Sequence, residues 1–337
     1  MVVVPCRLHA LCYDTESDGN RIGPLHPGIS GEPLIGKSGD KSNLMADRNK
    51  RLDSNAQGNF YVDATCINCD TCRQLAPLSF EEIGDYSAVH NQPQDDAQTH
   101  QAYQALLACP VGSIGTEHSD KLRLHQAMAS FPFQLENGVS YCGFNSEKSF
   151  GANSFFIEHP DGNWLIDSPR YLKHLVDVFA QRGGIAHIFL THKDDVADAD
   201  RYAAHFGAKR IIHRADVDAA PTAEQVIAGG EPVSVGSEFQ IIPVPGHTAG
   251  SMALLYRERF LFTGDHLWWD PHAQSLEAPT RLIWRKWTML DSLRKLLDYS
   301  FEWVLAGHGD RVHLSSMDLR RHLLALVERR EKGRSLR

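Results

Sequence analysis

The sequence of 337 residues lacks two features that would direct it to a membrane or to nucleic acid. No apolar run approaches the roughly 18 residues that a membrane-spanning helix needs. The formal net charge is −8, and the one dense basic run is the tail ERREKGRSLR, so the chain has no basic face to neutralise phosphates. We therefore expect neither a nucleic acid nor a membrane among its partners.

A signal-peptide core is lacking as well. The opening MVVVP is too short to be one, and Arg7 and His9 follow it in place of a cleavage site. The internal run MADRNK at Met45 is typical of a true start, and a plastid transit peptide is the competing interpretation. Acidic residues such as Asp14 and Glu16 disfavour a transit peptide, because such peptides are poor in acids.

Cysteine is scarce and unevenly placed. Three of the seven cysteines stand together in the run CINCDTC. In a chain with no export signal, such clustering favours ligation of a metal or cluster over disulfide bonds. We therefore expect a reducing compartment, most simply the cytoplasm, with the plastid stroma as a less favoured alternative.

Composition divides the chain into four parts. Residues 1–58, rich in Gly, Ser, Asp, Asn and Pro after residue 12, bury too little apolar surface to offset ordering and are predicted to be disordered. Residues 59–116 form a small unit with the clustered cysteines, and residues 117–130 form a linker helix. From residue 131 to residue 337, short strands alternate with helices, which is the pattern of α/β folds.

The cysteine run has the spacing C-x2-C-x2-C-x3-A-P. In bacterial ferredoxins a cysteine precedes the proline of this run and serves a second cluster, but here Ala76 takes its place. The complementary CP pair survives downstream in CPVGS. One complete ligand set remains: Cys66, Cys69, Cys72 and Cys109. About sixty residues thus resemble a single-cluster bacterial-type ferredoxin, and a cysteine at the middle position favours a 4Fe–4S cluster.

A structural zinc site and a set of buried free thiols are the two alternatives for these cysteines. Zinc usually takes two separated C-x2-C pairs, which the triple run fits poorly. The remaining cysteines, Cys6, Cys12 and Cys142, have no partners at useful spacing and are predicted to be inert thiols.

Four further stretches place polar residues directly after apolar strands: THKDD, PVPGHTAGS, FLFTGDHLWW and WVLAGHGD. Side chains at such strand ends converge on one edge of a sheet, where α/β folds build their sites. A single His after a strand is commonly a packing or capping residue. Four such stretches in this order indicate a site.

Their order resembles the metallo-β-lactamase superfamily, over residues 131 to about 330. The resemblance implies a four-layer αββα sandwich, usually hydrolytic, with one or two metal ions at the sheet edge. His247 fits the G-H-T-x-G-S motif, Asp265 fits the bridging carboxylate, and His308 fits the last His. In the H-x-H-x-D-H motif, His192 fits the first His and Asp194 stands at the second. Val196 and Ala197 fall where the Asp–His pair belongs.

The resemblance implies one firmly held metal ion and a second held weakly if at all. The first position keeps His192, Asp194, His247 and Asp265. The second keeps Asp265 and His308 but lacks its Asp–His pair, for which Asp195 or Asp198 could partly substitute. Two His with carboxylates suit zinc or iron, and the sequence leaves that choice open.

The function that follows is hydrolysis of a small-molecule ester or thioester by a metal-activated water. Asp265 or Asp195 would take the proton, and His308 would orient the substrate or stabilise the oxyanion. One alternative is a non-haem iron oxidoreductase that receives electrons from the cluster, which would involve a redox partner protein. Another is a cluster-bearing redox sensor with a non-catalytic second domain.

Aromatic residues near these motifs carry further expectations. Trp268 and Trp269 follow Asp265 closely and are candidates to line a substrate cleft. Trp284 and Trp287 stand at i and i+3, and we predict that they pack in the core from one face of a helix.

Overall fold

The computed structural model describes residues 46–335, and their side chains as far as residue 332. The interpretations of Met45, Cys6 and Cys12, and of disorder in residues 1–45, therefore fall outside the described residues. Among residues 46–335, no helix combines the length and the hydropathy that crossing a membrane requires.

The cysteine-bearing part contains two small sheets and two helices. Strand β1 (Phe60–Val62) pairs antiparallel with β4 (Ile114–Thr116), and β2 (Phe80–Ile83) forms a hairpin with β3 (Tyr86–Val89). Helix α1 (Thr71–Leu75) follows the cysteine run. Helix α2 (Asp96–Ala108) begins after Asp95, whose side chain caps it by accepting a hydrogen bond from the Gln98 amide.

The prediction of disorder is wrong for residues 46–58, which pack on this part. The Asp47 amide donates to Asp63 Oδ2 at 2.6 Å. The Asn55 side chain donates to the carbonyls of Leu52 and Val62, and its Oδ1 accepts from the Val62 amide. Composition hides such order, because it depends on one amide that satisfies several backbone groups rather than on apolar surface.

Residues 131–335 contain two large sheets. The first has seven strands, of which β11, β10, β9 and β8 run parallel. In order across the sheet they are β11 (Gln225–Ile227), β10 (Lys209–His213), β9 (His187–Phe189), β8 (Trp164–Ile166), β7 (Phe155–Ile157), β6 (Val139–Tyr141) and β5 (Phe133–Glu136).

The second sheet has six strands, mostly antiparallel, with β15 and β18 parallel. In order they are β12 (Val233–Val235), β13 (Phe239–Pro243), β14 (Met252–Tyr256), β15 (Phe260–Gly264), β18 (Trp303–Ala306) and β19 (Val312–His313). A separate hairpin joins β16 (Trp268–Asp270) to β17 (Ser275–Glu277).

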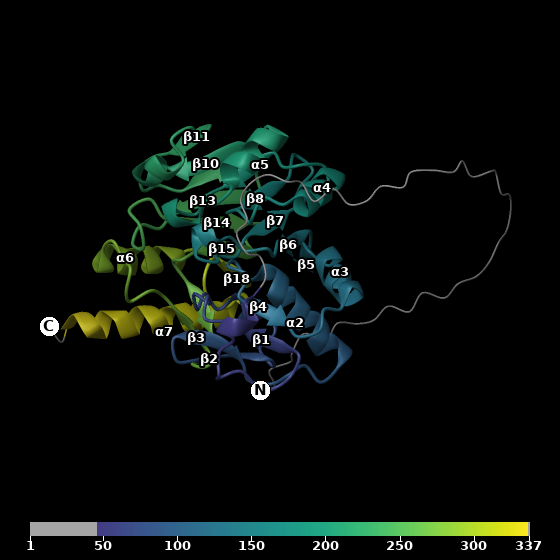
Figure 1. Cartoon of the computed structure of the whole chain (residues 1–337). Helices are drawn as coiled ribbons and strands as arrows, with labels where there is room; N and C mark the ends of the chain where they lie inside the picture. Colours follow the sequence, from purple (N-terminus) through teal and green to yellow (C-terminus); the bar gives the residue numbers. More distant parts are fainter. Residues whose placement is uncertain (1–45, 336–337) are drawn as a thin grey trace, which may run out of the picture. The chain divides into compact units, whose positions relative to one another are not determined.

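Helices cover the outer faces of both sheets, which gives the predicted four-layer αββα sandwich (Figure 1). Helices α4 (Lys173–Gln181) and α5 (Ala199–Phe206) cover the first sheet, and the Phe179 ring lies 4.7 Å from that of Phe156. Helices α6 (Lys286–Leu296) and α7 (Ser316–Ser335) share an apolar cluster with the second sheet. Phe155 and Phe262 meet between the sheets at 5.5 Å. The predicted linker helix is α3 (Lys121–Ala129).

Candidate functional site

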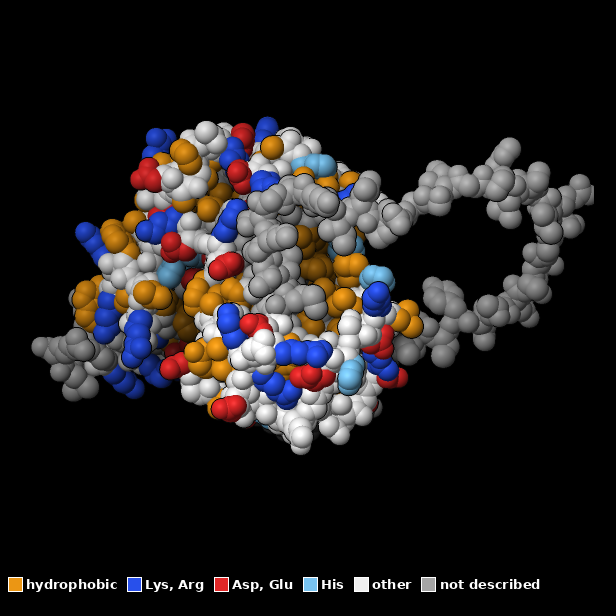
Figure 2. Space-filling view, in the orientation of Figure 1, with side chains coloured by type: hydrophobic (Ala, Val, Ile, Leu, Met, Phe, Trp, Pro, Cys, Tyr) orange, Lys and Arg blue, Asp and Glu red, His pale blue; other side chains and the backbone are white. Residues whose placement is uncertain are grey.

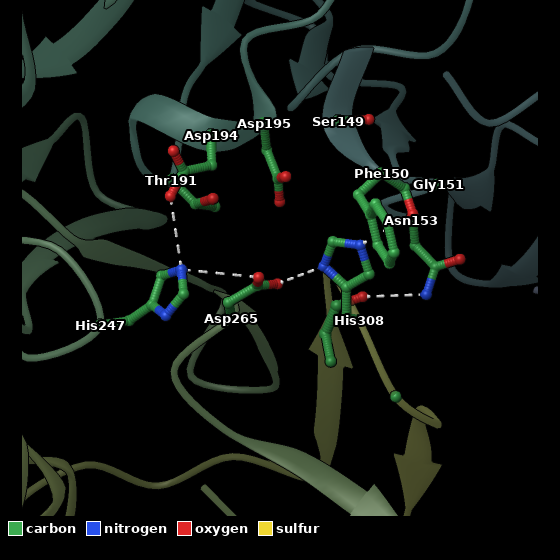
Figure 3. A network of polar contacts seen from close by, with 12 residues as sticks. Ser149, Phe150, Gly151, Asn153, Thr191, Asp194, Asp195, His247, Asp265 and His308 are labelled. Carbon is green, nitrogen blue, oxygen red and sulfur yellow. Dashed lines mark hydrogen bonds and ion pairs between the residues drawn. The ribbon is translucent and has the colours of Figure 1, made fainter. Parts of the chain in front are cut away.

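The first predicted metal position is assembled at the ends of three strands. The loops after β9, β13 and β15 bring His192, Asp194, His247 and Asp265 together, as Figure 3 shows for all but His192. Asp265 Oδ2 lies 3.8 Å from His192 Nε2 and 3.6 Å from His247 Nε2. Asp194 Oδ2 lies at the same two distances from these nitrogens. The donor atoms thus converge although three separate segments of the chain supply them.

The separations fit three ligands of one ion, since donor atoms of His192, Asp194 and His247 lie within 4.8 Å of one another, and His192, Asp195 and Asp265 form a second such group. Ligand atoms about 2.1 Å from a tetrahedral zinc ion lie about 3.4 Å apart. The His192 ring is 1% exposed, and its Nε2 has no hydrogen-bond partner among the described residues. A buried ring nitrogen without a partner, aimed at two carboxylates, is what a metal site requires of a neutral His.

A chain of hydrogen bonds orients the His192 ring. Thr191 Oγ1 lies 3.0 Å from His192 Nδ1, and the Thr191 amide and hydroxyl both donate to the Asp167 carboxylate. Burial raises the pKa of Asp167 to about 8, although the hydrogen bonds from Thr191 oppose that effect. Contacts of this kind hold ligand rings in position.

Asp216, which the sequence analysis missed, joins two of the ligand loops. Its carboxylate accepts from the Lys193 amide at 3.1 Å, the Thr248 hydroxyl at 2.5 Å and the Gly250 amide at 3.0 Å. A Cβ atom at Gly250 would lie 2.6 Å from Asp216 Cγ, which explains the glycine of the GHTAGS motif. The available signal was the position of Asp216 just beyond the strand KRIIH.

The second position holds Asp195 and His308 on either side of Asp265. His308 Nδ1 lies 2.8 Å from Asp265 Oδ1, a contact visible in Figure 3. Burial would lower the pKa of His308, but the Asp265 carboxylate raises it to about 10. Asp195 is 1% exposed, its Oδ2 lies 3.8 Å from His192 Nδ1, and neither oxygen has a hydrogen-bond partner among the described residues. Burial and the nearby Asp265 carboxylate raise the pKa of Asp195.

Asp198 does not join this site. Its carboxylate accepts from Lys148 Nζ at 2.6 Å and from the Tyr171 amide at 2.9 Å. Residues Lys193–Asp195 form a short 3-10 turn, and α5 begins only at residue 199. The Asp198 carboxylate therefore binds Lys148 and Tyr171 and does not reach the edge where Asp195 lies.

The donor atoms open into a cleft of about 1250 Å³. Trp268 lines it as predicted, whereas Trp269 packs against His322 at 5.0 Å. The prediction that Trp284 and Trp287 pack in the core is wrong. They are 47% and 42% exposed. Helix α6 begins only at residue 286, so Trp284 lies on the loop before it and the two residues do not share a helical face. Figure 2 shows hydrophobic side chains beside basic ones on the surface over α6.

The four predicted cluster ligands line one small pocket, together with Ser113 and Thr71. The Ser113 amide donates to Cys109 Sγ at 3.3 Å, and the Asn68 amide donates to Cys66 Sγ at 3.4 Å. Among the described residues, no three cysteine sulfurs lie within 4.8 Å of one another. A tetrahedral zinc ion requires sulfurs about 3.8 Å apart, so this pocket fits a wider cluster better than zinc. Cys142 is buried elsewhere as a free thiol.

Family models match both parts of the chain. Residues 135–327 match the family model of the metallo-beta-lactamase superfamily. Residues 62–116 match the model of the 4Fe-4S single cluster domain of ferredoxin I, which implies an iron–sulfur cluster.

The relatives found are hydrolases by name. A hydroxyacylglutathione hydrolase of Cereibacter sphaeroides is 32% identical over 43% of this chain and 57% of its own length. Another, from Acidiphilium cryptum, is 28% identical over 34% of this chain and 48% of its own length. The chain therefore spans about half the length of these relatives. A solved metallo-beta-lactamase family protein of Thermus thermophilus is 17% identical, with a TM-score of 0.45, over 59% of this chain and 81% of that one.

Proposed function

The chain belongs to the metallo-beta-lactamase superfamily, and from this premise we propose that it is a metal-dependent hydrolase of an ester or thioester. The observation that carries the proposal is the convergence of donor atoms from His192, Asp194 and His247, with Asp265 within 3.8 Å of both rings, beside an open cleft. The names of the relatives support a thioester, since hydroxyacylglutathione is one.

The residues of the chain divide the chemistry between them. When bound, an ion supplies a nucleophilic water at neutral pH and polarises the scissile carbonyl. Asp195 accepts the proton of the attacking water, because its buried carboxylate faces the site and has no hydrogen-bond partner among the described residues. His308, held by Asp265, presents its ring to the cleft and stabilises charge that develops on the carbonyl oxygen.

The cleft favours a substrate with an apolar acyl part and an anionic end. Phe150, Trp268 and Leu282 line it, as do the cationic side chains of Lys193 and Arg281. These two cations attract an anionic substrate, and the apolar side chains exclude water from the reacting bond.

The test is a panel of acyl thioesters and esters offered to protein purified without oxygen, with iron, zinc and acid-labile sulfide measured on the same sample. We expect about four irons and four sulfides for the cluster, about one further ion, and hydrolysis that disappears when that ion is chelated. Hydrolysis of no compound in the panel by fully loaded protein would refute the proposal. A second domain without any ion would favour a cluster-bearing sensor.

One observation favours a second candidate, a non-haem iron oxidoreductase. Cys69 and Asp70 line the same cleft as Asp265 and His308, so the predicted cluster lies beside the metal position. An iron ion in that position would exchange single electrons with the cluster. Five or six irons per chain without zinc, and turnover that requires a reduced cluster, would replace the hydrolase with this enzyme.

A further inference from the structure

The loop that carries the predicted cluster ligands forms one wall of the hydrolytic cleft. Asn68, Cys69 and Asp70 line the cleft together with Asp265 and His308. Asp70 makes the most direct link, since the Gly309 amide donates to its Oδ2 at 3.1 Å. Gly309 follows His308 in the chain, so a residue between two cluster ligands holds the backbone of a residue in the second site.

The other oxygen of Asp70 begins a second path to the same loop. Gln74 Nε2 donates to Asp70 Oδ1 at 2.5 Å, and Gln74 Oε1 accepts from Asn153 Nδ2 at 3.1 Å. The backbone amide of Asn153 in turn donates to the Gly307 carbonyl at 2.7 Å. Asp70 is therefore connected to the backbone on both sides of His308.

The cluster loop also packs directly on the loop before β7. A Cβ atom at Gly151 would lie 2.9 Å from Cys69 Sγ, so only a glycine allows this approach. The neighbouring Phe150 carbonyl lies 3.4 Å from His308 Nε2. Two residues near His308 therefore contact the cluster loop. Gly151, next to Phe150, packs on Cys69, and Gly309, next to His308, donates to Asp70.

We propose that Asp70 is a positioning residue of the hydrolytic site, which fixes the backbone that carries His308 and couples the cleft to the cluster loop. The role rests on the proposed hydrolysis, in which His308 faces the substrate. Asn68 and Asp70 both adopt the left-handed backbone region, with φ of 55° and 66°. Asn and Asp tolerate that region but do not prefer it, so ligation of the flanking cysteines helps to keep the loop in this shape. We therefore expect hydrolysis to slow when the cluster is not assembled.

The decisive experiment compares Asp70→Ala, Asp70→Asn and wild type in cluster-loaded and metal-loaded protein. In Asp70→Ala we expect kcat for a cleaved thioester to fall at least about tenfold while KM changes less than about threefold, because a displaced His308 acts on the transition state. Asp70→Asn keeps an acceptor oxygen and should recover most of the rate. Asp85→Ala, an exposed carboxylate of the same domain, is the matched control and should match wild type.

Amide hydrogen exchange of residues 305–312 gives a readout that needs no activity. We expect exchange in this segment to be about tenfold faster in Asp70→Ala, since the Gly309 amide loses its acceptor. Exchange and kcat both equal to those of Asp85→Ala, with iron and sulfide unchanged, would overturn the proposal. If wild type hydrolyses no thioester, the proposed function fails, and the exchange result still decides the role of Asp70.

Loss of the cluster from Asp70→Ala would confound this comparison. Gln74→Ala then decides, because it removes the donor to Asp70 Oδ1 and the link to Asn153 without touching a cysteine. We expect it to speed exchange in residues 305–312 by about threefold. Unchanged exchange in a cluster-loaded Gln74→Ala protein would overturn the proposal.

Discussion

The cluster region and the metal cleft gather their ligands in opposite ways. Three of the four cysteines stand within seven residues, Cys66 to Cys72, and the fourth follows the next long helix. The four donors of the first metal position come from the ends of three strands, between His192 and Asp265. The first arrangement is local and the second is distributed.

This difference determines what holds each site together. In the cluster loop, neighbouring backbone amides such as those of Asn68 and Ser113 point at the sulfurs. In the cleft, two of the three ligand loops are held by a polar residue from elsewhere: Asp167 for His192, and Asp216 for the loop of His247. A substitution in the cluster loop should therefore act locally, except through Asp70, whereas one in the cleft should spread to several loops.

His247→Ala should have the largest effect. It removes one of four donors at the first metal position, and we expect hydrolysis to fall about a thousandfold with loss of the bound ion. The cluster should stay, at about four irons and four sulfides per chain. Metal analysis and thioester turnover measure the two sites separately. The exposed His272→Ala is the control, and loss of the cluster with His247→Ala would break the separation of the two regions.

Asp195→Asn comes next, because it removes the proposed proton acceptor and keeps the shape. Turnover should fall about a hundredfold with the ion at the first position retained. Without metal, the variant should instead be more stable to urea than wild type by about 1–3 kcal/mol, since the unpartnered buried carboxylate becomes neutral. The exposed Asp200→Asn should change neither value. A metal-free variant less stable than wild type would show a structural role for Asp195.

Asp216→Ala tests whether the cleft depends on residues outside its ligands. Three donors lose their acceptor, so we expect metal affinity to fall about ten- to a hundredfold. Titration of metal-free protein with zinc measures this. Asp218→Ala, on the exposed side of the same turn, is the matched variant. Equal affinities of the two variants would mean that the ligand loops hold their shape unaided.

Cys66→Ser should remove the cluster and change hydrolysis less than the cleft variants do. We expect turnover to fall about tenfold, because the cluster loop bounds the His308 backbone, while the ion of the cleft remains. Cys142→Ser alters a buried thiol outside the cluster pocket and should keep both the cluster and the rate. A wild-type rate of hydrolysis by cluster-free Cys66→Ser protein would show that the cleft works independently of the cluster.

More of the cluster region than of the cleft can be predicted from the sequence, because the ligands of the cluster region are local and those of the cleft are distributed. Cysteine spacing is a local code, so Cys66, Cys69, Cys72 and Cys109 can be chosen without a fold. His192, His247 and Asp265 are identifiable because each follows an apolar strand. Asp216 and Asp70 escape prediction, because their partners are backbone amides 34 and 239 positions away. The exposure of Trp284 escapes it too, since helical spacing does not show where α6 begins.

The smallest expected effect on stability concerns the ion pair between Lys148 and Asp198, which holds the Asp198 carboxylate away from the metal site. Burial alone would raise the pKa of Asp198, but hydrogen bonds from Lys148 and the Tyr171 amide lower it. A lowered pKa in the folded state adds stability above the unfolded value of about 3.9, and this stability is lost as pH falls through the folded value. Lys148 is 63% exposed, so solvent screening limits the contribution to about 0.5 kcal/mol.

Lys148→Met should therefore lower the free energy of unfolding by that amount at pH 7, and by less near about pH 3, where the carboxyl of the unfolded chain is already largely protonated. Urea denaturation of chelated protein across this range measures the difference from wild type, since acid loss of the cluster affects both proteins equally. The exposed Lys209→Met should show no such change with pH in its stability relative to wild type. If Lys148→Met instead frees Asp198 to bind a second ion, metal content will rise above that of wild type, and the second position will have regained a carboxylate.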